Sequence, residues 1–544
     1  MAIRSRADTG EVLNQSPPFE NVDLFSTDLP LQDACKANGV AHEAAALSSF
    51  GRQWGSAGML ALGRQANENP PKLRSFDAKG RRSDTIEYHP AYHDLMRASV
   101  AAGLHASTWT AAGGRSAAPA EVARAARYYM AAQVESGHLC PITMTRAALA
   151  ALAPDPALLA KIAAKVVSQE YDAAFRPWWD KAGMTLGMGM TEKQGGTDVR
   201  ANTTAATPTV DGYVITGHKW FLSAPMCDAF LVLAQAPGGL TCFLLPRFRP
   251  DGSVNGLQLQ RLKDKLGNRS NASSEVEFAE AFAWRVGAEG AGIRTIIQMV
   301  QLTRLDCVLA SAGFMRMALA QAVHHCRYRS VFQRHLHDQP MMRAVLADLA
   351  LEVEGAVALA MRLAGAFDRA AADPVEAAYA RIVTPAAKYW VCKTAPGFIY
   401  EAMECLGGNG YVEESMLPRL YREAPVNAIW EGSGNVMGLD VLRAFSRENQ
   451  SGLLDSLTRE ADVPAAETAG PLNNLEHASE AHARAAVGRL ALLASIAALR
   501  ASAPPAIAEA FIRTRLSSVH GALYGAAAID TGTAEMLLQR ALPE

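Results

Sequence analysis

Apolar residues recur at helical spacing through the first third of the chain, from about residue 31 to residue 183. Residues three and four apart share one face of an α-helix, so this spacing indicates helices with one buried face. One such run consists of Val122, Ala125, Ala126 and Tyr129. A proline pair at 70–71 and a glycine pair at 113–114 indicate loops. The pattern predicts an N-terminal helical domain over residues 1–183.

Short apolar runs replace the helical pattern between residues 184 and 290. The runs at 213–216, 230–233 and 241–245 are rich in β-branched and aromatic residues, and turn residues such as Gly and Asp lie between them. Such runs bounded by turn formers are typical of strands. We therefore expect a small β domain of antiparallel strands over residues 184–290.

Long helical periods return after residue 290. They cover residues 293–334, 341–368 and 375–406. Helices of this length are typical of an antiparallel bundle, which we assign to residues 291–445. A polar linker follows through residue 471, and Ala-rich helices at 478–502 and 505–523 predict a helical extension over 446–544. The predicted fold class is mainly α with a central small antiparallel β domain.

Composition narrows the class of protein. The chain has 544 residues, of which 49% are hydrophobic and 19% charged, so it can form packed cores and exceeds a single small binding module. Its net charge of −2 provides no overall basic field to attract nucleic acid or an anionic membrane. The eight cysteines are scattered without a CxxC pair, which favours free thiols in a reducing compartment.

The N-terminal residues and the apolar runs indicate where in the cell the protein is located. The first twenty residues are polar and lack an apolar core, so we expect no signal peptide. The apolar run at 490–499 has about half the length of a membrane-spanning helix. The sequence therefore predicts no transmembrane segment and a cytoplasmic location.

Glycines and hydroxyl residues are concentrated at residues 189–198, where the helical pattern gives way to the strand pattern. Paired glycines let the backbone approach a ligand closely, exposed N–H groups can hold a pyrophosphate, and Thr191 and Thr197 add donors. This is the chemistry that a dinucleotide requires. An ordinary Gly-rich loop explains the segment equally well when it is considered alone.

A second glycine cluster lies near the end of the predicted bundle. It comprises Gly407, Gly408 and Gly410, with spaced charges at Glu404, Glu414, Arg419 and Glu423. In this order, the two glycine segments resemble the signature patterns of the acyl-CoA dehydrogenase flavoprotein family over about residues 50–445. The segments 14–18, 140–145 and 262–271, the length and the C-terminal extension resemble its AidB-like, alkylation-response branch. The resemblance implies FAD, a homotetramer and an association with DNA.

The same resemblance implies which residues bind FAD. They are Met188, Met190, Thr191, Gly196, Thr197, Phe221, Leu222, Ser223, Arg329, Gln339, Gly407, Gly408, Trp430 and Asn435. Phe221 would lie against the isoalloxazine ring, with strand packing as its alternative, and Ser223 would lie beside N5, where hydrogen bonding tunes the ring. Arg329 would pair with the pyrophosphate of a neighbouring subunit's FAD through its bidentate fork, and Gln339 would lie near the adenosine. Gln333 stands where the family usually has Gly.

The catalytic carboxylate implied by the resemblance is Glu431. It would remove the proton alpha to a thioester while flavin N5 takes hydride from the beta carbon; the alternative is a structural carboxylate near the cofactor. Arg304 matches a substrate-binding arginine, although an ion pair with Asp306 or another acid would explain it as well. Gln301 stands where many members have an Asp that helps hold CoA, so we expect substrate recognition to differ.

The extension is where this branch would contact DNA, and Arg513 and Arg515 are the candidate residues. Residues 446–544 carry eight Arg against eleven acidic residues, a net charge of −3, which is not a basic footprint. We therefore expect any DNA contact to be weak and to require the assembled oligomer. A solvated or subunit-facing surface is the alternative.

These observations predict an FAD-dependent oxidoreductase of the acyl-CoA dehydrogenase type, acting on a short or branched acyl thioester with an unidentified electron acceptor. One alternative is a DNA-associated flavoprotein that protects against alkylation with little turnover, and another is a flavin oxidase or monooxygenase acting on a small molecule. No metal site is predicted, because the local histidines lack acidic or thiol ligands at recognised spacing. These histidines are His324, His325, His335 and His337.

Overall fold

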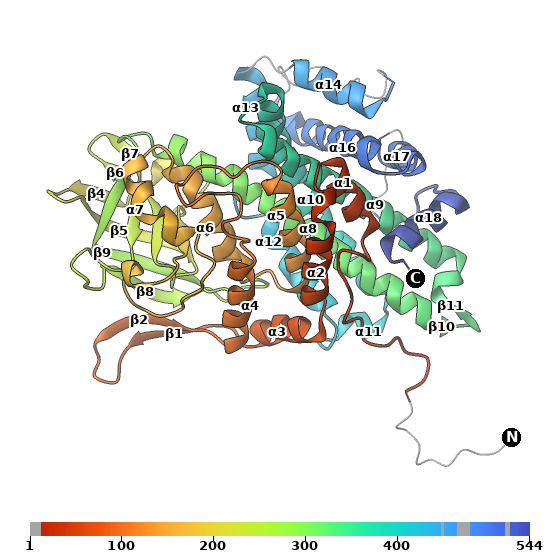
Figure 1. Ribbon diagram of the computed structural model, residues 1–544, viewed down its shortest axis with the longest axis horizontal. Helices are drawn as coiled ribbons and strands as arrows, with labels where there is room; N and C mark the ends of the chain where they lie inside the picture. Colours follow the sequence, from red (N-terminus) through yellow and green to blue (C-terminus); the bar gives the residue numbers. More distant parts are fainter. Residues whose placement is uncertain (1–11, 448–450, 465–478, 517–522, 544) are drawn as a thin grey trace, which may run out of the picture.

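The computed structural model describes residues 12–447, 451–464, 479–516 and 523–543. The β domain lies at one end of the longest axis (Figure 1). The middle is occupied by the long helices α8 (Gly292–Tyr328), α9 (Pro340–Arg369) and α10 (Pro374–Cys405), and the C-terminal helices lie toward the other end (Figure 1). This order of helix, strand and helix confirms the predicted fold class.

Helices dominate the N-terminal region, as predicted. Its elements are α1 (Leu29–Ala37), the 3₁₀ helix η1 (Ala41–Glu43), α2 (Ala44–Trp54), α3 (Ala57–Glu68), β1 (Lys72–Phe76), β2 (Arg82–Glu87), α4 (Pro90–Ala101), α5 (Ala120–Val134), α6 (Leu139–Leu152), α7 (Pro156–Val166) and the 3₁₀ helix η2 (Trp178–Asp180). The antiparallel hairpin β1–β2 was not predicted. Of the residues in these two strands, only Asp84 and Ile86 are buried, and the mostly polar sequence lacks the apolar alternation of a typical strand.

The β domain closes into a barrel. Its elements are β3 (Leu186–Gly189), the 3₁₀ helix η3 (Val199–Ala201), β4 (Ala205–Pro208), β5 (Tyr213–Ser223), β6 (Ala229–Ala236), β7 (Gly239–Pro246), β8 (Leu257–Leu262) and β9 (Ser273–Val286). The ladder runs β6–β4–β5–β9–β7 and returns to β6, while β8 pairs with β9. Most strand pairs are antiparallel, as expected, whereas β3, which was not among the expected strands, pairs with β6 in parallel, with Leu186 opposite Ala229. Along the chain, β4 and β5 lie between β3 and β6. The chain can therefore come back beside β3 with β6 running in the same direction as β3.

The bundle helices agree with the prediction for α9 and α10, whereas α8 ends earlier than expected. After Tyr328 the chain forms a two-residue hairpin between β10 (Ser330–Val331) and β11 (Arg334–His335), followed by the 3₁₀ helix η4 (Leu336–Asp338). Phe332 and Gln333 occupy the turn with φ of 53° and 64°. Two successive left-handed residues are typical of the tight turns that match strand twist. This conformation explains why Gly suits position 333.

Shorter helices complete the bundle and form the extension. They are α11 (Gly408–Tyr411), α12 (Leu417–Asn427), α13 (Gly434–Arg447), α14 (Ser451–Ala461), the 3₁₀ helix η6 (Glu480–His482), α16 (Ala483–Ser502), α17 (Pro505–Phe511), the π-helical turn η7 (Ile512–Leu516) and α18 (Thr531–Ala541). The predicted linker thus contains a helix, α14, and its Gly470–Pro471 end lies outside the described residues. The predicted helix at 505–523 is α-helical only to Phe511, and residues 517–522 also lie outside the described ranges.

The core is organised around α8, which contributes to two hydrophobic clusters. Ile296, Met299 and Leu302 pack with the barrel, α6 and α7, whereas residues from Leu305 onward pack with the N-terminal helices and the bundle. By length and composition, α8 and the run Glu480–Ser502 could each cross a membrane. Their most apolar windows are 89% and 72% buried, so both are core helices.

Candidate functional site

The first part of the candidate site is the edge of the barrel where β3 ends. Met188 and Met190 are half-buried there, and the backbone N–H of Trp220 on β5 donates to the Thr191 carbonyl at 2.8 Å. A Cβ placed on Gly196 would lie 2.2 Å from Thr191 Oγ1, so only glycine lets the loop fold against this threonine. Thr197 is exposed beyond it. The fold thus brings the glycine segment against the end of β5.

The second part is the end of β5 itself, where side chains alternate between the two faces of the strand. Phe221 is 47% exposed and Ser223 is half-buried, whereas the side chain of Leu222 is fully buried in the barrel core. Leu222 could therefore contact a cofactor only through its backbone. Lys263 Nζ lies 3.3 Å from the ring centroid of Trp220, a cation–π contact that holds this aromatic side chain in place.

A thiol connects this strand to the predicted base. Cys140, at the start of α6, lies close enough to Ser223 for that side chain to lower the pKa of its thiol. Burial raises the pKa of the Cys140 thiol to about 12, and the nearby charge of Glu431 contributes to the rise. Segments around residues 140, 223 and 431 therefore meet at one place. The sequence singled out Cys140 only as part of a branch motif, because nothing local indicates which strand it contacts.

Glu431 lies in a strained turn between α12 and α13. Its φ of 58° is left-handed, which is uncommon for a residue with a side chain. Thr303 Oγ1 donates to Glu431 Oε2 at 2.9 Å, Arg304 Nε donates to the Glu431 carbonyl at 3.0 Å, and Lys388 Nζ donates to the Gly432 carbonyl at 2.9 Å. Groups from α8 and α10 thus fix the turn and the carboxylate.

The electrostatics of Glu431 reflect the same neighbours. Burial raises the pKa of its carboxyl group, while the hydrogen bond from Thr303 and the charges of Arg304 and Lys388 oppose that rise. A partly solvated carboxylate whose pKa is raised binds a proton more strongly than one in water, which suits a general base. Thr303 and Lys388 were not found from the sequence, since they lie on other helices.

Arg304 is engaged within the protein. Its side chain is 5% exposed and pairs with Asp440 at 2.6 Å, and Arg381 pairs with the other oxygen of Asp440 at 2.7 Å. This arrangement favours the structural ion pair over the substrate contact, with Asp440 as the partner in place of Asp306. Both amide atoms of Gln301 are buried and have no hydrogen-bond partner among the described residues.

The remaining predicted cofactor residues lie on the bundle. Arg329 follows the end of α8, and at 1.5 Å per helical residue it lies about 39 Å from Thr303. Gln339 Nε2 donates to the Val331 carbonyl at 3.0 Å, which places it beside Arg329 at the hairpin. One chain therefore does not bring these two side chains close to Glu431.

The glycine loop and the segment around Glu431 offer further open positions. A Cβ on Gly407, whose φ is 60°, or on Gly408 would meet no atom within 4 Å, so the loop has room for a ligand. Trp430 Nε1 donates to Asn427 Oδ1 at 3.0 Å, and Asn435 is exposed on the first turn of α13.

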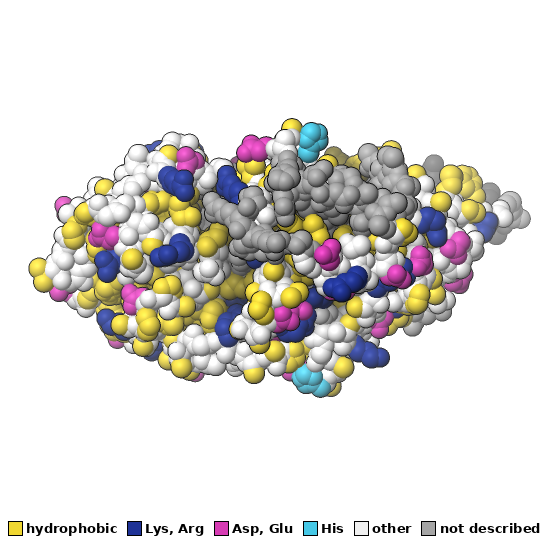
Figure 2. Space-filling model, turned by 90° about the horizontal axis from the view of Figure 1, so that it is seen from above, with side chains coloured by type: hydrophobic (Ala, Val, Ile, Leu, Met, Phe, Trp, Pro, Cys, Tyr) yellow, Lys and Arg dark blue, Asp and Glu magenta, His cyan; other side chains and the backbone are white. Residues whose placement is uncertain are grey.

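The two candidate DNA contacts differ in exposure. Arg513 is exposed and lies 3.7 Å from Asp530. Arg515 is 3% exposed and forms ion pairs with Asp348 and Glu352 of α9, so a phosphate cannot reach it and its prediction as a DNA contact is wrong. On the face seen in Figure 2, Lys and Arg side chains of the described residues are interspersed with Asp and Glu. That distribution resembles an ordinary solvated surface.

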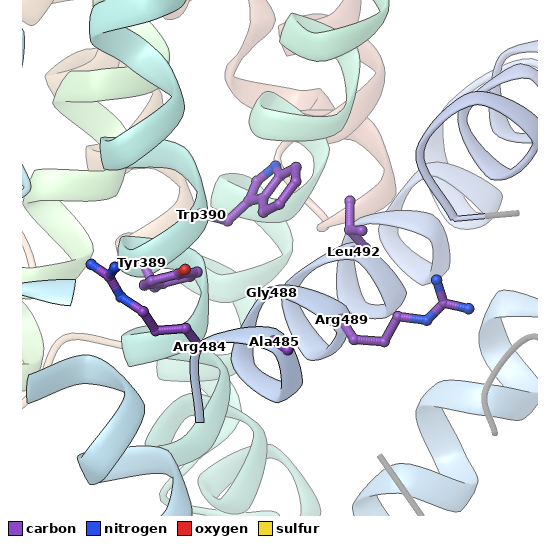
Figure 3. A pocket seen from close by; sticks show the side chains of 7 residues that line it. All are labelled: Tyr389, Trp390, Arg484, Ala485, Gly488, Arg489 and Leu492. Atoms are coloured by element: carbon purple, nitrogen blue, oxygen red, sulfur yellow. The ribbon is translucent and has the colours of Figure 1, made fainter. Parts of the chain in front are cut away.

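A cavity of about 490 Å³ lies between α10 and α16. It is lined by Tyr389, Trp390, Arg484, Ala485, Gly488, Arg489 and Leu492. Figure 3 shows the Arg484 and Arg489 side chains extending toward opposite ends of this cavity, and Arg489 Nη1 donates to the Leu516 carbonyl at 2.6 Å. None of the predicted flavin residues lines it. The described residues also contain no cluster of three His, Cys, Asp or Glu side chains that could hold a metal ion.

Comparison with known proteins identifies the family. Residues 14–173 match the adaptive response protein AidB N-terminal domain, residues 187–281 the acyl-CoA dehydrogenase middle domain, and residues 290–445 the acyl-CoA dehydrogenase C-terminal domain. AidB of Escherichia coli (strain K12) is 51% identical over 452 residues, which cover 83% of this chain and 82% of that protein. The chain belongs to the acyl-CoA dehydrogenase family, in its AidB branch.

More distant members support the same assignment. Acyl-CoA dehydrogenase family member 11 of Caenorhabditis elegans is 32% identical over 465 residues, covering 82% of this chain and 74% of that protein. The structure of Caenorhabditis elegans ACDH-11 in complex with C11-CoA has a TM-score of 0.81 at 27% identity and covers 99% of this chain and 94% of that one. The apo form of Bd2924 has a TM-score of 0.82 at 27% identity, covering 90% and 99%. This family of oxidoreductases is FAD-dependent.

Proposed function

We propose that this protein binds FAD and oxidises the alpha–beta bond of a short or branched acyl thioester, with Glu431 as the base. The observation that carries this proposal is the placement of a half-buried carboxylate in a turn fixed by Thr303, Arg304 and Lys388, near enough to Cys140 for its charge to raise the pKa of that thiol. The structure of ACDH-11 with C11-CoA supports an acyl-CoA ligand for a fold of this kind.

The residues at the barrel edge fit a flavin. Phe221 offers an exposed aromatic face, and Ser223 offers a hydroxyl on the same face of β5. The close contact of Gly196 with Thr191 gives a tight loop beside them. Planar rings pack well on aromatic and thioether groups. Phe221 supplies the aromatic group, and Met188 and Met190 supply the thioethers. When bound, FAD supplies the hydride acceptor for the reaction.

The protein's own contribution is to hold and tune the base. Glu431 takes the proton from the alpha carbon of the thioester onto its carboxylate, which Thr303 orients through Oε2. The alpha proton is weakly acidic, so a partly desolvated carboxylate with a raised pKa is a stronger base than one in water. Arg304 and Lys388 hold the carbonyl groups of Glu431 and Gly432, so the carboxylate needs little reorganisation during the reaction.

The test is anaerobic reduction of the bound flavin by a panel of acyl-CoAs. Glu431→Gln keeps the shape of the side chain and removes the base, so flavin reduction should slow by about 10² or more. Glu414→Gln, an exposed carboxylate on the same part of the bundle, is the matched control and should reduce at the wild-type rate. Unchanged kinetics in the Glu431 variant would place the base elsewhere. A flavin that no acyl-CoA reduces but that reacts rapidly with oxygen after chemical reduction would favour the oxidase alternative.

The proposed assembly is a homotetramer. Large apolar side chains are exposed on the bundle and its hairpin, which is typical of surfaces that subunits cover. They include Phe332, Met341, Tyr400, Tyr411, Tyr421 and Ile429. Because Arg329 and Gln339 lie far from Glu431 in one chain, they would serve the FAD of a neighbouring subunit. Sedimentation of the purified protein as a monomer with full FAD occupancy would contradict this arrangement.

A further inference from the structure

An N-terminal arm, defined here as residues 14–19, lies across the end of α8. The Asn14 side chain binds both backbone groups of Ser330. Its Nδ2 donates to the Ser330 carbonyl at 2.8 Å, and its Oδ1 accepts from the Ser330 N–H at 2.7 Å. Asn14 has a left-handed φ of 56°, a conformation that Asn tolerates better than most residues. The arm is thus attached to the first residue of the hairpin.

The same residue also fixes Arg329. Nη1 of Arg329 donates to the Asn14 carbonyl at 2.8 Å. A guanidinium carries five N–H donors in one rigid plane, so holding one of them orients the rest. The donors that Asn14 does not use are therefore presented in a defined direction.

The next residue of the arm reaches the glycine loop. Asn409 Nδ2 donates to Gln15 Oε1 at 2.8 Å, and Asn409 directly follows Gly407 and Gly408. Two adjacent residues, Asn14 and Gln15, thus join the arginine after α8 to a loop that lies about 80 residues later in the chain.

The rest of the arm is anchored along the last turns of α8. His324 makes a hydrogen bond with the Pro17 carbonyl at 2.8 Å, and its ring packs on Phe19 with centroids 5.1 Å apart. His325 makes a hydrogen bond with Ser16 at 3.3 Å. These contacts also account for two of the clustered histidines, which pack against the arm.

We propose that the N-terminal arm is a positioning element of the FAD site, which holds Arg329 and the 407–410 loop together so that they grip the pyrophosphate of the FAD bound by a neighbouring subunit. This inference rests on the proposed function. Without the arm, Arg329 would sample several rotamers and the glycine loop would be free to move. Binding of FAD would then have to order both groups, and the entropy cost of that ordering would weaken the binding. The arm therefore acts on retention of FAD and leaves the base untouched.

The experiment compares three variants of the full-length holoprotein. Asn14→Ala combined with Gln15→Ala removes both side-chain links, Asn14→Asp keeps the acceptor for the Ser330 N–H, and Leu13→Ala, an exposed neighbour, is the control. The readouts are the rate of FAD release, followed by flavin fluorescence, and hydrogen exchange of the hairpin amides. We expect release about 10 to 100 times faster in the double variant, with faster exchange at Ser330, wild-type behaviour of Leu13→Ala and partial rescue by Asn14→Asp.

The outcomes separate the arm from the proposed function. Faster exchange at Ser330 with an unchanged rate of FAD release would overturn the role of the arm in cofactor retention. Unchanged exchange in the double variant would overturn the contacts themselves, whether or not FAD is bound. Wild-type protein that cannot be loaded with FAD would overturn the proposed function and this role together. A merely structural effect would lower the melting temperature of the FAD-free protein, whereas the inference requires faster FAD release with the melting temperature of the FAD-free protein unchanged.

Discussion

Replacing Arg515 with Gln should loosen the C-terminal extension from the bundle. The side chain of Arg515 is fully buried, and its partners Asp348 and Glu352 are 1% and 3% exposed. Removing one partner of a buried ion pair leaves uncompensated charge and costs about 3–5 kcal/mol. Here the carboxylates keep other donors, because Gly525 N donates to Asp348 at 2.8 Å and Trp390 Nε1 donates to Glu352 at 3.1 Å. The lower value, about 3 kcal/mol, is therefore the expectation.

The assay is hydrogen exchange in the native protein, since a chain with several packed regions does not unfold in one step. A loss of about 3 kcal/mol in the opening free energy accelerates exchange by about 10²-fold, because each 1.4 kcal/mol is a factor of ten. The affected amides should be those of η7 and of α9 around residues 348–352. Thermal melting of the barrel, which does not contact Arg515, should change little.

Arg513→Gln is the matched control. Arg513 lies two residues away, its side chain is 51% exposed, and its distance of 3.7 Å from Asp530 marks a weak surface pair. Such pairs contribute about 0–1 kcal/mol, so exchange should stay within a few-fold of wild type. Equal effects of the two substitutions would refute the assignment of Arg515 to a buried ion pair. So would an Arg515→Gln protein with normal exchange and selectively weakened DNA binding.

Three further predictions concern the cofactor site and the hairpin. The rate of flavin reduction by an acyl-CoA should fall on the acid side as pH drops through the raised pKa of Glu431, since the protonated carboxyl cannot accept a proton; a midpoint at or below 4.5 would contradict the effect of burial. Gly196→Ala should lower FAD content, measured by absorbance, by about tenfold or more, because the new Cβ would lie 2.2 Å from Thr191 Oγ1 and displace the loop. Gln333→Gly should stabilise the hairpin by up to about 1 kcal/mol by relieving a left-handed φ of 64°, and faster hydrogen exchange at Arg334 would refute this.

The sequence by itself determined the elements whose signal is local. The bundle helices predicted at 341–368 and 375–406 agree within one residue with α9 (Pro340–Arg369) and α10 (Pro374–Cys405). Both begin at a proline in the first helical turn and contain long apolar periods, which are properties of neighbouring residues. The two glycine segments are visible in the same way as residue types at short spacing, whereas Glu431 was chosen because its segment resembles the one that supplies the base in the family.

Elements without a strong local signal were missed. The strands of the β1–β2 hairpin are mostly polar, and the end of α8 differs from the following hairpin mainly in backbone dihedrals. In each case the stabilising contacts come from elsewhere in the chain. Periodicity within a short window contains no information about such contacts.

Only the tertiary structure decided which side chains share a site and which charges are accessible. Cys140, Thr303 and Lys388 acquire their relation to the Glu431 turn from contacts between separate helices. Arg513 and Arg515 look alike in the sequence, yet one is exposed while the other is neutralised by acids more than 160 residues earlier in the chain. The energy of a charge depends on its burial and its partners, and both are set by long-range packing that the order of residues does not display.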